Sequence, residues 1–207
     1  MTEIARIARE CGRDPTGITL VAVSKGYPWE QVEQAYRLGC RDFGENRLLE
    51  AFEKKAQAPS DVCWHFIGNL QKNKVRKAVG AFVLIHSVDS LELAEKISEC
   101  SEEQGIATKI LLQVNTSGEQ TKHGQTPEEW RRDLERVMSL RGVNIEGLMT
   151  MAPFVEDEGV IRKCFSDLHV LKQEFGLHHL SMGMSHDYPI AIQEGATLLR
   201  LGTVLWT

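Results

Sequence analysis

Eight short apolar runs alternate with amphipathic segments along almost the whole chain, and this alternation limits the folds open to it. The first run, residues 18–24, shows no polar alternation, which is typical of a strand buried on both faces of a parallel sheet. We predict strands at Ile18–Ser24, Arg41–Gly44, Trp64–Gly68, Phe82–Ser87, Lys109–Asn115, Ile145–Thr150, His178–Met184 and Leu198–Gly202. Helices are expected at residues 2–11, 29–38, 46–57, 70–78, 90–104, 127–139, 157–175 and 188–195.

Local residue types support two of these helix starts. Thr126, Pro127 and Glu129 have the order of an N-cap, a proline in the first turn and a capping-box glutamate. Ser90 stands where an N-cap serine belongs, directly before the segment LELAEKISEC.

Regular alternation of strands and helices predicts a parallel α/β fold. A closed (β/α)8 barrel fits the number of strands, and 207 residues is near the lower end for that fold, so its loops must be short. An open doubly wound sheet is the alternative. We therefore expect a single barrel domain over residues 1–207. Because little chain follows the last strand, we expect no helix after it and expect the opening helix to cover it instead.

The charge and cysteine content exclude several classes of protein. The formal net charge is −5, so the chain as a whole does not attract nucleic acid or an anionic membrane. The N-terminal segment lacks the apolar core and cleavage site of a signal peptide, and no apolar run is long enough to cross a membrane. The cysteines are odd in number, and no two are close in sequence: Cys11, Cys40, Cys63, Cys100 and Cys164. This pattern fits neither a disulfide framework nor a zinc site and indicates a reducing, cytoplasmic compartment.

Lys25 directly follows the first predicted strand, in the stretch VAVSKGYP. Sites in both candidate folds gather at the carboxyl ends of the strands. A lysine that points into a barrel mouth is desolvated, which frees its amine to act as a nucleophile. The alternative is a lysine at the rim of the barrel, paired with Glu45 or Asp187.

A second candidate site lies at the last two strands, in the stretches SMGMSHDYPIAIQEG and RLGT. Gly183 and Ser185 precede a predicted helix, and Gly202 and Thr203 end the neighbouring strand. Backbone N–H groups at such places bind anions, and the loops after strands seven and eight commonly hold phosphate in this fold. A tight turn with a serine cap is the alternative. A reactive lysine opposite a phosphate site would accept a phosphorylated aldehyde such as pyridoxal 5'-phosphate (PLP), as an imine on Lys25.

The motifs together resemble those of the YggS/PROSC family, the PLP homeostasis proteins, which are similar to the N-terminal barrel domain of alanine racemase. The resemblance runs in order from about residue 18 to residue 204, through VAVSKGYP, FGEN, WHFIGNLQKNK, IHSVDS, QVNTSGEQTKHG, GLMTM, LSMGMSHDYPIAIQEG and RLGT. It implies a cofactor site in which Lys25 forms the imine and Arg200 faces the pyridine nitrogen. In that implied site the phosphate is held by Ser185, Gly202, Thr203 and the backbone near Gly183. Asn46 and His65 are implied to lie near the cofactor.

The resemblance also implies a role in PLP and amino-acid homeostasis, without a firmly established reaction. A weak PLP-dependent amino-acid racemase is the alternative, and a regulator that contacts apo PLP-dependent enzymes is a third. We expect a monomer and no metal site. A barrel hydrolase with a metal on His65, His86, His178, His179 and Asp187 lacks any HxH or HExxH motif.

Two positions depart from the family pattern. Relatives usually carry a second lysine where this chain has Tyr27, in SKGYP, and they often continue past the stretch LGTVLWT with a short basic tail. Exchange of the cofactor and any function of that tail are therefore expected to differ here.

Overall fold

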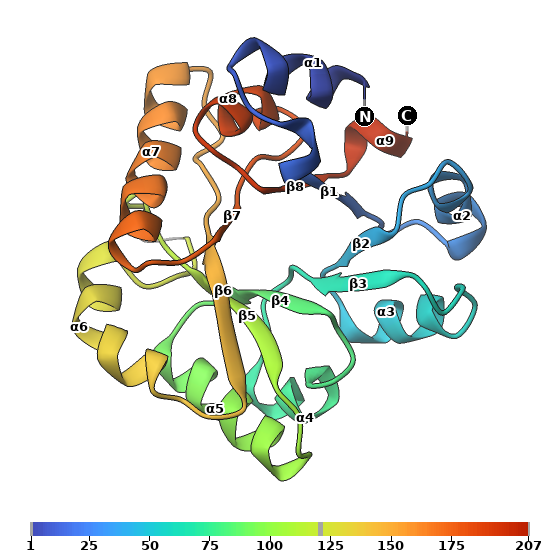
Figure 1. Cartoon of the computed structure of the whole chain (residues 1–207). Coiled ribbons are helices and arrows are strands. Elements are labelled where there is room, and N and C mark those ends of the chain that lie inside the picture. The colour runs from blue at the N-terminus through green and yellow to red at the C-terminus, as the bar shows by residue number, and fades with distance from the viewer. Residues whose placement is uncertain (1, 120–121, 207) are drawn as a thin grey trace.

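Eight parallel strands close into a barrel in chain order, and helices surround it (Figure 1). The computed structural model describes residues 2–119 and 122–206. The strands are β1 (Thr19–Val23), β2 (Asp42–Glu45), β3 (Cys63–Phe66), β4 (Leu84–Val88), β5 (Thr108–Gln113), β6 (Val143–Met149), β7 (His179–Ser181) and β8 (Leu198–Leu201). The predicted (β/α)8 barrel is confirmed, and the open sheet is wrong.

Helices follow the strands as the sequence predicts. They are α1 (Thr2–Glu10), α2 (Trp29–Arg37), α3 (Leu48–Lys55), α4 (Val75–Ala78), α5 (Leu91–Glu103), α6 (Pro127–Met138), α7 (Glu158–Glu174), α8 (Tyr188–Gln193) and α9 (Thr203–Trp206), with short 3-10 turns η1 (Pro15–Gly17) and η2 (Lys72–Lys74). The capping box at Thr126 and Glu129 forms, and Ser90 Oγ accepts from Leu93 N at 3.3 Å. None of the described helices is long and apolar enough to cross a membrane.

Two expectations about the ends of the chain are wrong. The helix α9 follows β8 directly, although it has only four residues. The opening helix α1 packs mainly against α8 rather than over β8, with Ile4 and Ile7 buried. Just after α1, Arg13 donates to the carbonyl oxygens of Ile192 at 2.5 Å and Ala196 at 2.7 Å, at the end of α8. The cover over the last strand is therefore shared between α8, which α1 braces, and α9.

Pairing of β1 with β8 closes the barrel and fixes which residues of the two strands are neighbours. The register runs from Thr19 opposite Leu198 to Ala22 opposite Leu201, and it places Val21 opposite Arg200. Side chains alternate between the interior of the barrel and the outer layer against the helices. Val21 and Leu198 pack inside with Leu84, Leu111 and Met149.

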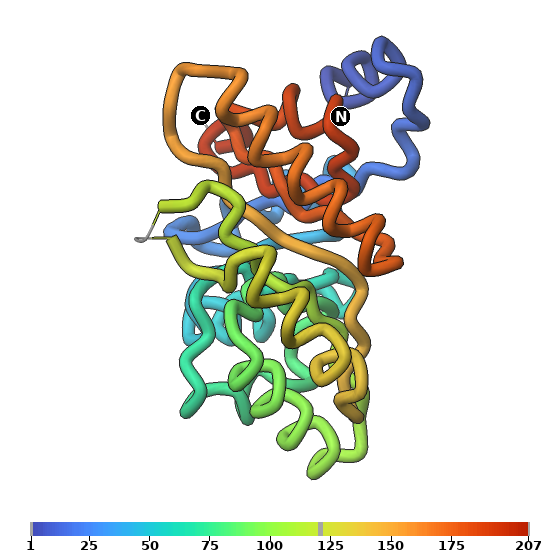
Figure 2. Tube along the Cα trace, turned by 90° about the vertical axis from the view of Figure 1, so that its left-hand side faces the viewer, coloured from blue at the N-terminus to red at the C-terminus, as the bar shows by residue number. Residues whose placement is uncertain are grey.

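The loops that follow the strands open on one side of the barrel. Figure 2 shows the segments after β5 and β6 leaving on the same side. Lys25, Asn46, Ser185 and Thr203 each follow a strand, so the closed topology brings them to this carboxyl-end mouth.

A buried ion pair outside the barrel holds the end of β1 against β2 and α3. Lys54 Nζ lies 2.5 Å from Glu45 Oε1 and 2.5 Å from the carbonyl oxygen of Ser24, and Ser24 Oγ donates to the same Glu45 oxygen. The exposed fraction is 0 % for the Glu45 side chain and 7 % for that of Lys54. Ser24 precedes Lys25, so this cluster positions the strand end from which Lys25 leaves.

We expect Lys54→Met to lower the free energy of unfolding by about 3–5 kcal/mol, because it leaves the Glu45 carboxylate buried without a counter-charge. Urea denaturation of the purified variant measures this. Lys163→Met is the control: Lys163 is 75 % exposed in a surface pair with Asp167, and its loss should change stability by less than about 0.5 kcal/mol. A loss below about 1 kcal/mol for Lys54→Met would show that water reaches the carboxylate.

Candidate functional site

Lys25 stands at the mouth of the barrel, in a turn directly after β1. Gly26, with φ +78°, makes that turn. The Lys25 side chain is exposed, so the expectation that it is desolvated is wrong for this structure. Neither expected rim partner holds it, because Glu45 pairs with Lys54 and Asp187 binds the loop after β7. Within the described ranges, Lys25 makes no ion pair, which leaves its amine available.

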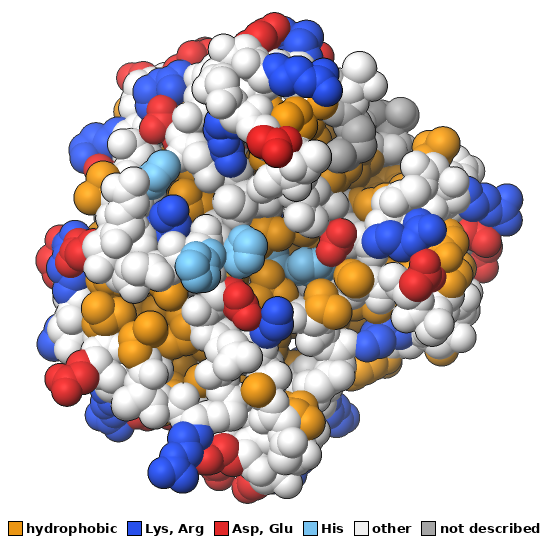
Figure 3. Space-filling model, in the orientation of Figure 1, with side chains coloured by type: hydrophobic (Ala, Val, Ile, Leu, Met, Phe, Trp, Pro, Cys, Tyr) orange, Lys and Arg blue, Asp and Glu red, His pale blue; other side chains and the backbone are white. Residues whose placement is uncertain are grey.

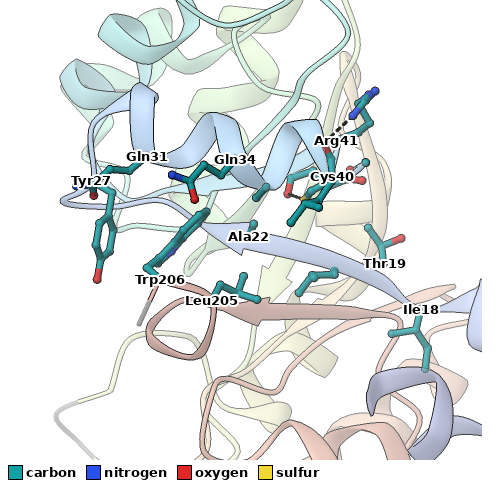
Figure 4. Close-up of a pocket in the computed structure, with 15 residues that line it drawn as sticks. Ile18, Thr19, Ala22, Tyr27, Gln31, Gln34, Cys40, Arg41, Leu205 and Trp206 are labelled. Atoms are coloured by element: carbon teal, nitrogen blue, oxygen red, sulfur yellow. Dashed lines mark hydrogen bonds between the residues drawn. The ribbon is translucent and has the colours of Figure 1, made fainter. Parts of the chain in front are cut away.

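The loop after Lys25 is anchored to the last helix. The rings of Tyr27 and Trp206 lie 5.6 Å apart between centroids, and Trp206 Nε1 donates to the carbonyl oxygen of Val23 at 2.7 Å. Figure 4 shows both rings at one end of a groove between α2 and the outer face of β1. Tyr27, which stands where relatives usually carry a second lysine, therefore packs against the last helix. The groove is lined by outward side chains such as Leu20 and Ala22, so it lies outside the barrel and apart from Lys25.

The loop after β7 and the end of β8 form the second part of the site. Gly183 has φ +93°, and a Cβ there would lie 2.6 Å from Ala191 Cβ, so a side chain does not fit. Its carbonyl oxygen accepts from Arg200 N at 3.0 Å. Gly202 N donates to Ser185 Oγ at 3.4 Å, and Thr203 is the first residue of α9. The structure thus brings together all four residues of the predicted phosphate site.

Asp187 stabilises the loop after β7 through a hydrogen bond to its backbone. Its Oδ1 accepts from Met184 N at 2.5 Å, and its carboxylate lies 3.2 Å from His186 Nε2. Burial raises the pKa of Asp187 above its ordinary value.

Asn46 directly follows β2 and packs tightly against the end of β3. A Cβ on Gly68 would lie 2.2 Å from the carbonyl oxygen of Asn46, so only glycine allows this approach. Asn46 Oδ1 is buried and accepts no hydrogen bond from the described part of the chain. A buried acceptor without a donor at the mouth fits a bound group that supplies one.

Arg200 extends from β8 into the barrel and is almost fully buried. Its two terminal nitrogens donate to Ser181 Oγ at 2.5 Å and to the carbonyl oxygen of Thr150 at 2.8 Å. Burial lowers the pKa of the guanidinium to about 10, while Asp187 raises it, so Arg200 remains charged at pH 7. A guanidinium carries five N–H donors and no acceptor, and these two contacts leave others free to donate to a ligand.

His65 lies deeper in the barrel than the other predicted site residues. Its Nε2 is 2.9 Å from Asp42 Oδ1, and its Nδ1 is 2.9 Å from His86 Nε2. It lines a cavity at the amino ends of the strands, together with Asp42 and His179. Its place near the cofactor stays a prediction. No group of three metal-binding side chains lies together among residues 2–119 and 122–206.

Comparisons with known proteins identify the family of this chain. The family model described as "Alanine racemase, N-terminal domain" matches residues 3–207. A "Pyridoxal phosphate homeostasis protein" of Aquifex aeolicus is 40% identical, over 98% of this chain and 93% of that protein. One from Synechocystis is 42% identical, over 93% of this chain and 92% of that protein. The chain belongs to the PLP homeostasis protein family.

Solved structures show the same fold. PipY of Synechococcus elongatus, solved with PLP bound, matches with a TM-score of 0.88 at 39% identity, over 99% of this chain and all of that one. An alanine racemase of Clostridium difficile matches with a TM-score of 0.76 at 16% identity, which shows a shared fold. This member of the PLP homeostasis family covers 55% of that racemase chain.

Sequence reasoning missed the residues that surround Arg200. Ser181 lies on β7 and Thr150 directly follows β6, and both are far from Arg200 in sequence. The two-residue periodicity of the strands places Ser181 and Arg200 inside the barrel. It does not show which inward side chains meet across the interior.

His86 gives a pH dependence that can be measured. Burial lowers the pKa of His86 well below its ordinary value, and the neighbouring His65, Arg200 and His179 add to this. Below about pH 6.5 the unfolded chain binds a proton at His86 that the folded protein does not, so stability falls as pH falls. Between pH 7.5 and pH 5.5 we expect the free energy of unfolding to fall by about 1 kcal/mol less in His86→Gln than in wild type.

Urea denaturation of wild type and variant at both pH values measures that difference. The control is His178→Gln, because His178 is exposed at the start of β7. An unchanged pH dependence in His86→Gln would mean that His86 takes up its proton in the folded protein.

Proposed function

We propose that this chain binds PLP at the carboxyl-end mouth, as an imine on Lys25, and acts in PLP and amino-acid homeostasis. The observation that carries the proposal is the relation between Lys25 and Arg200. Val21 is paired with Arg200, and Lys25 follows the carboxyl end of the same strand, two residues after Val23. The inward guanidinium of β8 thus lies below the mouth where the lysine emerges. The names of the relatives and the PLP-bound structure of PipY support the same ligand.

Each site residue has a defined task in this proposal. The Lys25 amine forms a C=N bond to the aldehyde carbon, and the aldehyde oxygen leaves as water. Ser185, Gly202, Thr203 and the backbone at Gly183 hold the phosphate. Arg200 donates to the pyridine nitrogen, and Asn46 offers its buried acceptor beside the mouth. PLP supplies an electron-withdrawing ring that stabilises carbanions when that ring is protonated.

Arg200 favours carriage of PLP over turnover. A charged arginine can only donate, so it keeps the ring nitrogen unprotonated and weakens the ring as an electron sink. Barrel racemases add a tyrosine as a second acid or base. Here Tyr36 donates to Asp61 at 2.8 Å on the outer surface, and Tyr27 packs on Trp206. A weak racemase is therefore the second candidate.

We further propose that the protein is a cytoplasmic monomer that contacts apo PLP-dependent enzymes. The odd, widely spaced cysteines support a reducing compartment. Release of PLP to an enzyme is consistent with an exposed lysine.

We expect the purified protein with added PLP to show an imine absorption band that borohydride reduction removes, and we expect Lys25→Ala to show none. The control is Lys109→Ala, because Lys109 lies near the start of β5, at the opposite end of the barrel. Mass spectrometry of the reduced protein locates the added group.

The outcomes separate the alternatives. A band that persists in Lys25→Ala places the imine on another lysine, and no band in wild type removes PLP as the ligand. Incubation of the loaded protein with single enantiomers of amino acids decides between carrier and racemase, since only a racemase makes the opposite enantiomer.

A further inference from the structure

A continuous line of polar side chains crosses the interior of the barrel from Arg200 to Asp42. Arg200 donates to Ser181 Oγ at 2.5 Å, and Ser181 Oγ lies 2.8 Å from His86 Nδ1. His86 Nε2 lies 2.9 Å from His65 Nδ1, and His65 Nε2 lies 2.9 Å from Asp42 Oδ1. The five residues come from five strands, β8, β7, β4, β3 and β2. We call this line the interior relay.

The line joins the two ends of the barrel. Arg200 lies below the carboxyl-end mouth, whereas Asp42 and His65 line a cavity at the amino ends of the strands. Lys109, Glu146 and His179 line the same cavity. In Figure 3, histidine and acidic side chains gather over the centre of the barrel. The Asp42 side chain is 31% exposed, so the relay begins at solvent and ends at a buried cation.

The chemistry of the two ends fixes the direction of every hydrogen bond. Arg200 has only donors, so Ser181 accepts from it, and the Ser181 proton is free to go to His86 Nδ1. A neutral His86 then carries its proton on Nε2 and donates to His65 Nδ1.

The same reasoning from the other end agrees. A carboxylate only accepts, so His65 carries its proton on Nε2 and donates to Asp42. His65 Nδ1 is then bare and needs the proton of His86 Nε2. With both imidazoles neutral, each is the Nε2–H tautomer, and all dipoles align between a cation and an anion.

We propose that Asp42 is a positioning residue that acts through His65, His86 and Ser181 to hold Arg200 in place for the cofactor ring. This inference rests on the proposed function only for the identity of the ring. Asp187 also favours the charge on Arg200, so the distinct contribution of the relay is orientation. With its proton directed to His86, Ser181 presents only lone pairs to Arg200, and Asp42 maintains that arrangement.

The hydrogen-bond directions are tested without any cofactor. Long-range ¹H–¹⁵N NMR of histidine-labelled protein at pH 7.5 distinguishes the tautomers. His65→Gln and His86→Gln assign the two rings. We expect both to be neutral Nε2–H forms. A ring protonated on Nδ1, or on both nitrogens, overturns the relay, whether or not the protein binds PLP.

The action on Arg200 is tested by a double-mutant cycle on the dissociation constant for PLP. We expect Asp42→Ala to weaken binding about threefold to tenfold, and Asp42→Asn, which keeps an acceptor for His65, to recover most of it. Ser181→Ala should weaken binding as well, and adding Asp42→Ala to it should change little, because both remove the same arrangement. Glu146→Ala is the matched control, since Glu146 lines the same cavity and pairs with Lys109 rather than with the relay.

The cycle separates a relay from ordinary packing. Effects of Asp42→Ala and Ser181→Ala that add independently, or an effect of Glu146→Ala as large as that of Asp42→Ala, overturn the proposal. Thermal unfolding of each variant shows that the measured protein is folded. Loss of PLP binding by wild type would contradict the proposed function, and the NMR result would still decide the directions of the hydrogen bonds.

Discussion

The buried guanidinium of Arg200 is the group to which the interior of this barrel is adapted. An arginine does not lose its charge in a protein, so its burial must be balanced by acceptors and by opposite charge. Ser181 and the carbonyl oxygen of Thr150 provide the acceptors, and Asp187 provides a nearby negative charge. An eight-stranded barrel usually fills its interior with branched apolar side chains. Here Val21, Leu84, Leu111, Met149 and Leu198 do so, and polar residues share the space with them.

Charge is handled differently inside and outside the barrel. Outside β1 and β2, Glu45 and Lys54 form a direct buried ion pair that secures the end of β1. Inside, the cation of Arg200 and the carboxylate of Asp42 are separated by a hydroxyl and two imidazoles. A direct ion pair would use the donors of Arg200 on a carboxylate. Separation by neutral groups leaves some of those donors free at the mouth, where the proposed ligand would need them.

The sequence contains most of the fold because each strand is a separate apolar run and several helices begin at recognisable caps. It does not reveal α9, because a helix of four residues is too short to show a period. The exposure of Lys25 also escapes the sequence, since the turn at Gly26 decides where the side chain points. The partners of Arg200 and His65 depend on which inward side chains meet across the barrel. Which side chains meet depends on the register and tilt of the strands. Pairing between neighbouring strands sets both, so no local sequence pattern reveals them.

Histidines in this chain illustrate how residue type alone misleads. His65 and His86 lie on neighbouring strands of a barrel, as ligands of a metal hydrolase would, and Asp42 lies beside them. A metal ligand must direct its bare nitrogen at a shared point, with the other nitrogen bound to an orienting group. The two rings instead direct nitrogens at each other, 2.9 Å apart, and their outer nitrogens at Asp42 and Ser181. No common point remains for an ion between these two rings. The same side chains instead form a line of hydrogen bonds that ends at Arg200.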